Sequence, residues 1–238
     1  MKIHQKYWAV LPAAGAGQRM NSPLAKQYLS LCGKTVIENT LERLMAFSPL
    51  EKLVVVVAEN DTCWPTMPIK QHNKLHTVMG GSERIHSVLN GLKYLDQWAD
   101  AGDWVLVHDV ARPCVRLSDI TTLIEQLKNH PVGGLLAYPV QDTMKRADAA
   151  LEVQKTVPRE QLWHALTPQM FRLGPLRAAL ESVLEKGGIV TDEAAAMESM
   201  GHAPMLVSGS RDNIKITYPE DLALAQYFLE NQSNSADF

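Results

Sequence analysis

The chain has 238 residues, of which 46% are hydrophobic and 21% charged, with a net charge of −3 at neutral pH. This composition is typical of a soluble globular protein, and it offers no global positive field for nucleic acid or an anionic membrane surface. We find no apolar run of the ~20 residues that a spanning helix needs and no apolar signal-peptide core near the start. Three cysteines without metal-type spacing favour a reducing cytoplasm.

Apolar segments and helical patterns alternate along the chain. Continuous runs rich in β-branched residues predict buried strands at residues 7–11, 53–58, 75–79, 104–109, 133–140 and 204–207. Apolar residues at helical spacing predict helices at residues 35–45, 82–95, 118–127, 176–184, 191–200 and 217–229. We expect capping boxes at Thr35–Glu38 and Thr217–Glu220, and Ser118 as the cap of the third helix.

This alternation predicts one α/β domain over residues 1–238, with a Rossmann-like, mostly parallel twisted sheet and helices on both faces. Residues 141–161 differ, because they are polar, compatible with β-structure and longer than a plain connection. We expect a projecting β-arm at about 139–161, with Trp163 and His164 as structural parts of its return. In such sheets ligands bind beyond the carboxyl ends of the strands.

The loop after the first strand is the main candidate site. Gly15 and Gly17 allow backbone N–H groups to approach and cradle phosphate oxygens. Arg19 and Lys26 then supply the charge that a polyphosphate needs. The glycine spacing alone is more typical of a tight turn, but the two cations favour a nucleotide triphosphate loop.

Two better-known nucleotide motifs are excluded at this loop. The third glycine of a dinucleotide-binding fingerprint would fall at Met20, and no matching acidic residue ends the second strand. A P-loop ending at Gly33-Lys34-Thr35 would need a glycine at Tyr28.

Asp109 ends the fourth predicted strand. A lone Asp in such a place commonly caps a turn, but beside a triphosphate loop it is a candidate Mg²⁺ ligand, because Mg²⁺ binds one or two carboxylates plus phosphate oxygens. Arg112 could pair with Asp109 or contact a ligand, and both interpretations stay open. We expect His108 to be a packed histidine.

Other polar residues are less informative by themselves. Asp212 and Lys215 lie at another strand end, where Lys215 could equally be a solvated surface lysine. Four further candidates lie on the arm and nearby loops: Thr143, Arg159, Thr167 and Thr191.

Taken together, these segments resemble the 2-C-methyl-D-erythritol 4-phosphate cytidylyltransferase family. The matching segments are Pro12–Met20, Lys26–Leu29, Gly80–Arg84, Val107–Pro113, Asp142–Arg146, Trp163–Gln169, Thr191–Ala194 and Asp212–Lys215. They follow the family's order from residue 9 to 229, whereas the first loop alone would indicate only the wider sugar-nucleotidyltransferase class. The resemblance implies a nucleotidyltransferase fold of the glycosyltransferase-A-like type.

The resemblance also implies a reaction. CTP and methylerythritol phosphate would give the cytidine diphosphate product and pyrophosphate, with Mg²⁺, in isoprenoid precursor biosynthesis. Arg19 and Lys26 would stabilise the reacting α-phosphate and the leaving pyrophosphate. The residues implied for the nucleotide are Ala13, Ala14, Gly15, Gly17, Gly81, Ser82, Ser87 and Asp109.

Further implied roles concern the metal, the acceptor and the partner subunit. Asp109, helped by Asp212, would hold Mg²⁺. The residues implied for the methylerythritol phosphate are Arg112, Thr167, Thr191 and Lys215, together with Thr143 and Arg159 on the arm. In this family the arm reaches across a homodimer to complete the neighbouring site.

Two alternatives remain at this point. One is another polyol-phosphate cytidylyltransferase, such as one that makes CDP-ribitol, which would differ mainly in its acceptor pocket. The other is a non-catalytic nucleotide-binding regulator. The presence of Arg19, Lys26, Asp109 and Lys215 speaks against a regulator, because a sensor has no need to stabilise a leaving group.

Overall fold

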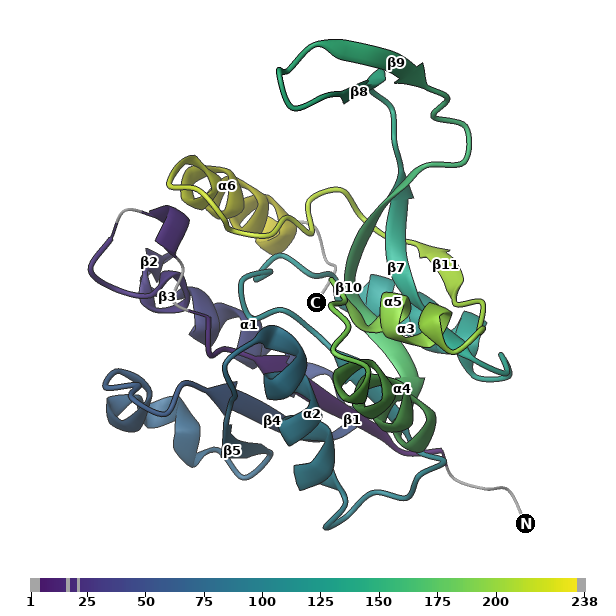
Figure 1. Ribbon diagram of the computed structural model, residues 1–238. Coiled ribbons are helices and arrows are strands. Elements are labelled where there is room, and N and C mark those ends of the chain that lie inside the picture. Colours follow the sequence, from purple (N-terminus) through teal and green to yellow (C-terminus); the bar gives the residue numbers. More distant parts are fainter. Residues whose placement is uncertain (1–4, 16–17, 21, 235–238) are drawn as a thin grey trace.

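The computed structural model describes residues 5–15, 18–20 and 22–234. Its centre is a seven-stranded sheet in the order β11-β7-β10-β6-β1-β4-β5 (Figure 1). The strands are β1 (Tyr7–Pro12), β4 (Leu50–Val57), β5 (Leu75–Met79), β6 (Trp104–Val107), β7 (Gly133–Pro139), β10 (Trp163–Arg172) and β11 (Met205–Ser208). Among the described strands of this sheet, β10 is the one that runs antiparallel to its neighbours. The predicted mostly parallel α/β sheet is therefore confirmed.

Helices cover both faces of this sheet. They are α1 (Val36–Ala46), α2 (Arg84–Leu95), α3 (Leu117–Leu127), α4 (Leu173–Glu185) and α5 (Glu193–Ser199), whereas α6 (Glu220–Asn234) packs in a separate cluster beside the sheet. Successive strand side chains point to opposite faces, so Ala9 and Leu11 pack in a core with α1 and α3. Trp8 and Val10 pack in a second core with α2, α4 and α5. Burial on both faces explains the continuous apolar runs of these strands.

Two of the three predicted helix caps are wrong. The capping box of α1 is confirmed, because Thr35 Oγ1 accepts the N–H of Glu38 at 3.3 Å and the Glu38 carboxylate accepts the N–H of Thr35 at 2.8 Å. Helix α3 starts one residue before Ser118, which therefore lies inside it. Before α6, the N–H groups of Thr217 and Tyr218 donate to Asp221 rather than to Glu220.

Strand β10 is absent from the sequence prediction. Trp163 and His164 are not merely the return of the arm, since they open this strand and pair with β7. The strand then continues between β7 and β6, with a register irregularity between Ala165 and Gln169. Its buried polar residues Thr167 and Gln169 interrupt the apolar run that marked the parallel strands.

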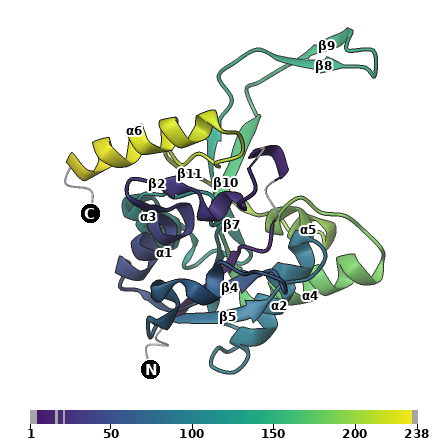
Figure 2. The same ribbon diagram turned by 90° about the vertical axis from the view of Figure 1, so that its left-hand side faces the viewer.

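Between β7 and β10 the chain leaves the sheet and forms a separate hairpin of β8 (Met144–Ala147) and β9 (Val153–Val157). Figures 1 and 2 show this hairpin well away from the sheet. Its predicted role in a dimer stays a prediction. A second small hairpin, β2 (Ser30–Leu31) and β3 (Lys34–Thr35), lies near α6. No helix in the described part of the chain has both the length and the apolarity for a membrane span.

Candidate active site

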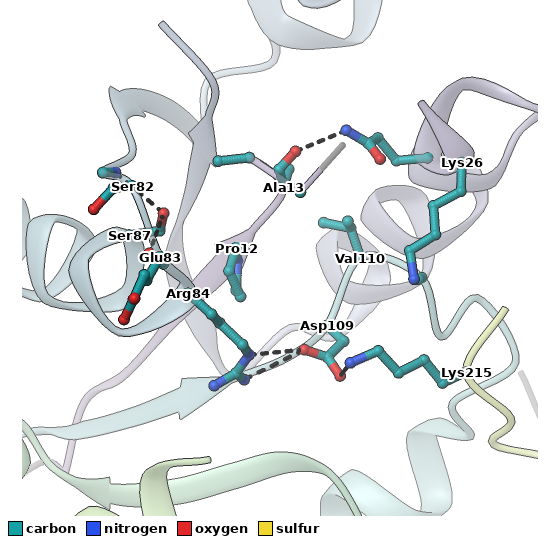
Figure 3. A pocket seen from close by; sticks show the side chains of 15 residues that line it. Pro12, Ala13, Lys26, Ser82, Glu83, Arg84, Ser87, Asp109, Val110 and Lys215 are labelled. Carbon is teal, nitrogen blue, oxygen red and sulfur yellow. Dashed lines mark hydrogen bonds and ion pairs between the residues drawn. The ribbon is translucent and has the colours of Figure 1, made fainter. Parts of the chain in front are cut away.

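A cavity lies where several strand ends meet (Figure 3). The end of β1, the turn after β5 and the residues after β6 contribute to its wall, as does the loop before α6. The lining residues are Pro12, Ala13, Ala14, Gly15, Lys26, Gln27, Gly81, Ser82, Glu83, Arg84, Ser87, Asp109, Val110, Ala111 and Lys215. The cavity thus brings together Gly15, Gly81 and Asp109, which follow three different strands, while Gly17 lies outside the described residues.

One side of the cavity is built from backbone and small side chains. Gln27 is buried and its Nε2 donates to the carbonyl of Ala13 at 2.8 Å, which fixes the start of the glycine loop. Opposite, the N–H of Gly81 donates to Ser87 Oγ at 3.2 Å. A Cβ on Gly81 would lie 2.4 Å from the Cβ of His86, so this close turn requires glycine. Main chain and small side chains thus form a slot on this side of the cavity, and Glu83 is the charged residue beside Ser82 (Figure 3).

Asp109 occupies the floor of the cavity and is surrounded by cations. Its Oδ2 lies 2.9 Å from Lys215 Nζ and 3.6 Å from Arg112 Nε, and its Oδ1 lies 3.3 Å from Arg84 Nη2. Figure 3 shows Arg84 and Lys215 approaching the carboxylate from opposite sides. Burial alone would raise the pKa of Asp109, but these three cations hold that pKa well below its ordinary value. Asp109 is therefore a carboxylate at neutral pH.

A hydrogen-bonded chain supports Asp109 from below. The backbone N–H of Asp109 donates to Thr167 Oγ1 at 3.1 Å, and Thr167 Oγ1 lies 2.9 Å from His108 Nδ1. His108 Nε2 lies 3.1 Å from the carbonyl of Arg112, which can only accept, so Nε2 carries the proton and Nδ1 accepts from Thr167. Burial lowers the pKa of His108 to about 4. His108 is thus packed, as expected, and it is neutral at pH 7.

Lys26 and Arg19 differ in their surroundings. Lys26 points into the cavity, and its Nζ donates to the carbonyl of Ile216 at 2.9 Å. Burial, followed by the positive charge of Lys215, lowers the pKa of Lys26 to about 8. Arg19 is exposed and does not line the cavity; its guanidinium lies 5.8 Å from the ring centre of Tyr218.

Several predicted residues are not brought to the cavity of their own chain. Thr191 is exposed just before α5, and Thr143 and Arg159 are exposed at the two ends of the projecting hairpin. Thr167 and Arg112 contact Asp109 without lining the cavity. Asp212 is also outside the lining, and its Oδ2 accepts from Arg116 at 2.7 Å and from Gln232 at 2.9 Å.

The sequence interpretation gave no role to Arg84, Glu193 or Gln27. Arg84 lines the cavity and joins Asp109 to Glu193, whose Oε1 lies 2.6 Å from Arg84 Nη1. The sequence did offer a signal for Arg84, because this residue begins a helix that follows closely on the Gly80-Gly81 turn. The sequence offered no such signal for Glu193, because its partner Arg84 is 109 residues away in the chain.

Known proteins resemble this chain over nearly its whole length. A family model described as 2-C-methyl-D-erythritol 4-phosphate cytidylyltransferase matches residues 7–231. The enzyme of that name from Vibrio parahaemolyticus is 51% identical over 224 residues, which are 94% of this chain and 95% of the relative. That from Tolumonas auensis is 48% identical over 228 residues, 96% of this chain and 98% of the relative.

Solved structures give the same result. The crystal structure of 2-C-methyl-D-erythritol 4-phosphate cytidylyltransferase from Francisella tularensis superposes with a TM-score of 0.81 at 36% identity. The superposition covers 94% of this chain and 100% of the Francisella tularensis chain.

Proposed function

The chain belongs to the 2-C-methyl-D-erythritol 4-phosphate cytidylyltransferase family, and we propose that the cavity described above is the site where it transfers the CMP group of CTP to methylerythritol phosphate. The observation that carries this proposal is that a slot of main chain and small side chains meets Lys26, Lys215 and Asp109 in one cavity. The slot suits a base, and the cations suit a phosphate chain.

The transfer itself asks the protein for positioning and charge neutralisation. An oxygen of the acceptor's phosphate attacks the α-phosphorus of CTP, and the bond from that phosphorus to the bridging oxygen breaks, so that pyrophosphate leaves with the electron pair. Lys26 has three N–H donors, one of which goes to Ile216; the others are available to phosphate oxygens. Arg19, at the outer end of the loop, adds a second charge for the leaving group.

Selectivity for cytosine follows from the slot. Ala13, Ala14 and Gly81 present backbone groups, and Ser82 and Ser87 present hydroxyls near that backbone. A pyrimidine ring placed against these backbone groups would be recognised by its shape and by amide hydrogen bonds, which would exclude the larger purine ring. Gly15, with Gly17 in the same loop, would place its N–H toward the phosphates.

Asp109 fits a magnesium ion bound through one carboxylate and phosphate oxygens. No three His, Cys, Asp or Glu side chains gather into a metal site among the described residues, so the remaining ligands would come from the triphosphate and water. Bound there, Mg²⁺ would neutralise negative charge on the triphosphate. Asp212 fits this role poorly, because it does not line the cavity and its Oδ2 accepts from Arg116 and Gln232.

The acceptor would lie on the far side of Asp109. Lys215 is half-buried there, and we include Arg112, Thr167 and Thr191 in the acceptor site. Thr143 and Arg159 lie at the ends of a hairpin that projects from the sheet (Figure 1), so they would serve the site of a second copy in a homodimer. Free cysteines at all three positions suit a cytoplasmic enzyme.

A substrate panel tests the proposal. Purified protein with CTP and Mg²⁺ should release pyrophosphate with methylerythritol 4-phosphate and much more slowly with ribitol 5-phosphate. Turnover with ribitol phosphate alone would replace the proposed acceptor. Tight CTP binding without pyrophosphate release from any polyol phosphate would favour the regulator instead.

A further inference from the structure

Glu193 is a buried carboxylate that the proposed reaction does not use. It is the first residue of α5, and only 1% of its surface is exposed. Its two oxygens contact Arg84 in a bidentate pair, with 2.6 Å between Oε1 and Nη1 and 3.2 Å between Oε2 and Nη2. A bidentate pair fixes the plane of a guanidinium as well as its position.

The same guanidinium also contacts Asp109. Arg84 Nε and Nη2 both lie 3.3 Å from Asp109 Oδ1. The contacts to Glu193 are shorter, so Glu193 is the main anchor of Arg84 and Asp109 the second partner. Lys215 and Arg112 approach Asp109 through the other oxygen, Oδ2.

Glu193 is itself held firmly by the sheet. Gln169 of β10 is 1% exposed, and its Oε1 accepts the N–H of Ala194 at 2.8 Å. Its Nε2 donates to Asp192 Oδ2 at 2.9 Å, and Asp192 Oδ1 accepts the N–H of Ala195. The first turn of α5 is therefore tied to β10, the strand next to β6, and Asp109 follows shortly after the end of β6.

We propose that Glu193 is a positioning residue of the nucleotide site, which acts through Arg84 to hold the carboxylate of Asp109 in place. The inference rests on the proposed function, because its effect is measured with CTP. Without the charge at Glu193, the guanidinium of Arg84 keeps a single carboxylate partner and shifts toward Asp109. The guanidinium of Arg84 then competes with Lys215 and with the nucleotide for the carboxylate of Asp109.

The test is the variant Glu193→Gln, which keeps the size of the side chain and removes its charge. We expect kcat/KM for CTP to fall about 10- to 100-fold, the scale of a small misplacement in an active site, with KM for the acceptor unchanged. The matched control is Glu181→Gln, which removes the partner of Lys93 in another ion pair to α2, away from the cavity, and should behave as wild type. A loss confined to the acceptor KM would overturn the inference.

A double-mutant cycle separates positioning from a general structural effect. If Glu193 acts through Arg84, adding Glu193→Gln to Arg84→Gln should cause no further loss of kcat/KM for CTP. Losses that multiply would overturn the inference. Should Glu193→Gln fail to fold, the test uses Glu193→Asp instead. This variant keeps the negative charge, but its shorter side chain cannot make both contacts to Arg84. An unchanged kcat/KM for CTP in Glu193→Asp would also overturn the inference. A wild-type protein that is inactive with CTP and methylerythritol phosphate would refute the proposed function instead.

Discussion

Lys26 keeps its charge in surroundings that oppose it. Burial and neighbouring Lys215 lower its pKa to about 8, so in the free protein the ammonium loses its proton as the pH rises through that value. A bound triphosphate is anionic and raises the pKa again. We therefore expect kcat/KM for CTP, which reports the free enzyme, to fall above about pH 8, while kcat persists to higher pH.

The pH profile of Lys26→Arg checks this assignment, because a guanidinium stays charged throughout the range. Whatever activity remains in Lys26→Arg should lack the decline near pH 8. If the decline persists, another group is responsible for it.

Removing either basic residue of the loop should affect turnover more than binding. Since Lys26 and Arg19 are proposed to stabilise charge that develops in the transition state, Lys26→Ala or Arg19→Ala should lower kcat roughly 10²- to 10³-fold, with a modest change in CTP affinity. Pyrophosphate release and equilibrium CTP binding measure the two effects. Lys34→Ala is the control, because this exposed lysine pairs with Glu42 outside the cavity. Normal turnover in both loop variants would exclude the role.

At the scale of elements, the end of β6 depends on a neutral histidine. The pKa of His108 is about 4 in the folded protein and ordinarily 6.5, so between these values the unfolded chain binds more protons. The resulting stability is fully present above about pH 6.5 and is lost as the pH falls toward 4. Between pH 7 and pH 5, the free energy of unfolding of the wild type should therefore fall by about 2 kcal/mol more than that of a variant that lacks the titrating histidine.

Urea unfolding of wild type and His108→Gln at the two pH values measures that difference. Other titrating groups are common to both proteins and cancel in the comparison. Equal losses of stability would show that His108 is not held neutral by the fold.

The elements that the sequence predicted well are those whose pattern is local. β1 and β4 are apolar because both faces of the parallel sheet are covered, and α1 is preceded by its own capping box. β10 was missed because Thr167 and Gln169 are polar and buried, with partners in Asp109 and α5 that lie far away in the chain. The same holds for the cavity. Its glycines and Asp109 follow strands that the local pattern predicts, whereas Arg84 and Glu193 are brought together only by the folded chain.

At the scale of the whole molecule, the hairpin β8–β9 is the part that the folded chain does not use for its own sheet. Its strands are exposed, with Leu151 and Val153 among the most exposed apolar residues. Such a surface is costly on a lone chain, which supports the proposed homodimer. Each site would then take Lys26 from one subunit and Arg159 from the other.

Mixing two inactive variants tests this sharing. In a heterodimer of Lys26→Ala and Arg159→Ala subunits, one site receives both substitutions and the other receives neither. Random exchange makes half of the dimers mixed, so activity should recover to at most about a quarter of the wild-type value. Mixing Lys26→Ala with Arg19→Ala is the control, because both residues come from the same subunit of each site and no intact site can form. If fluorescence confirms exchange and the first mixture still shows no recovery, Arg159 acts within its own chain or outside the site.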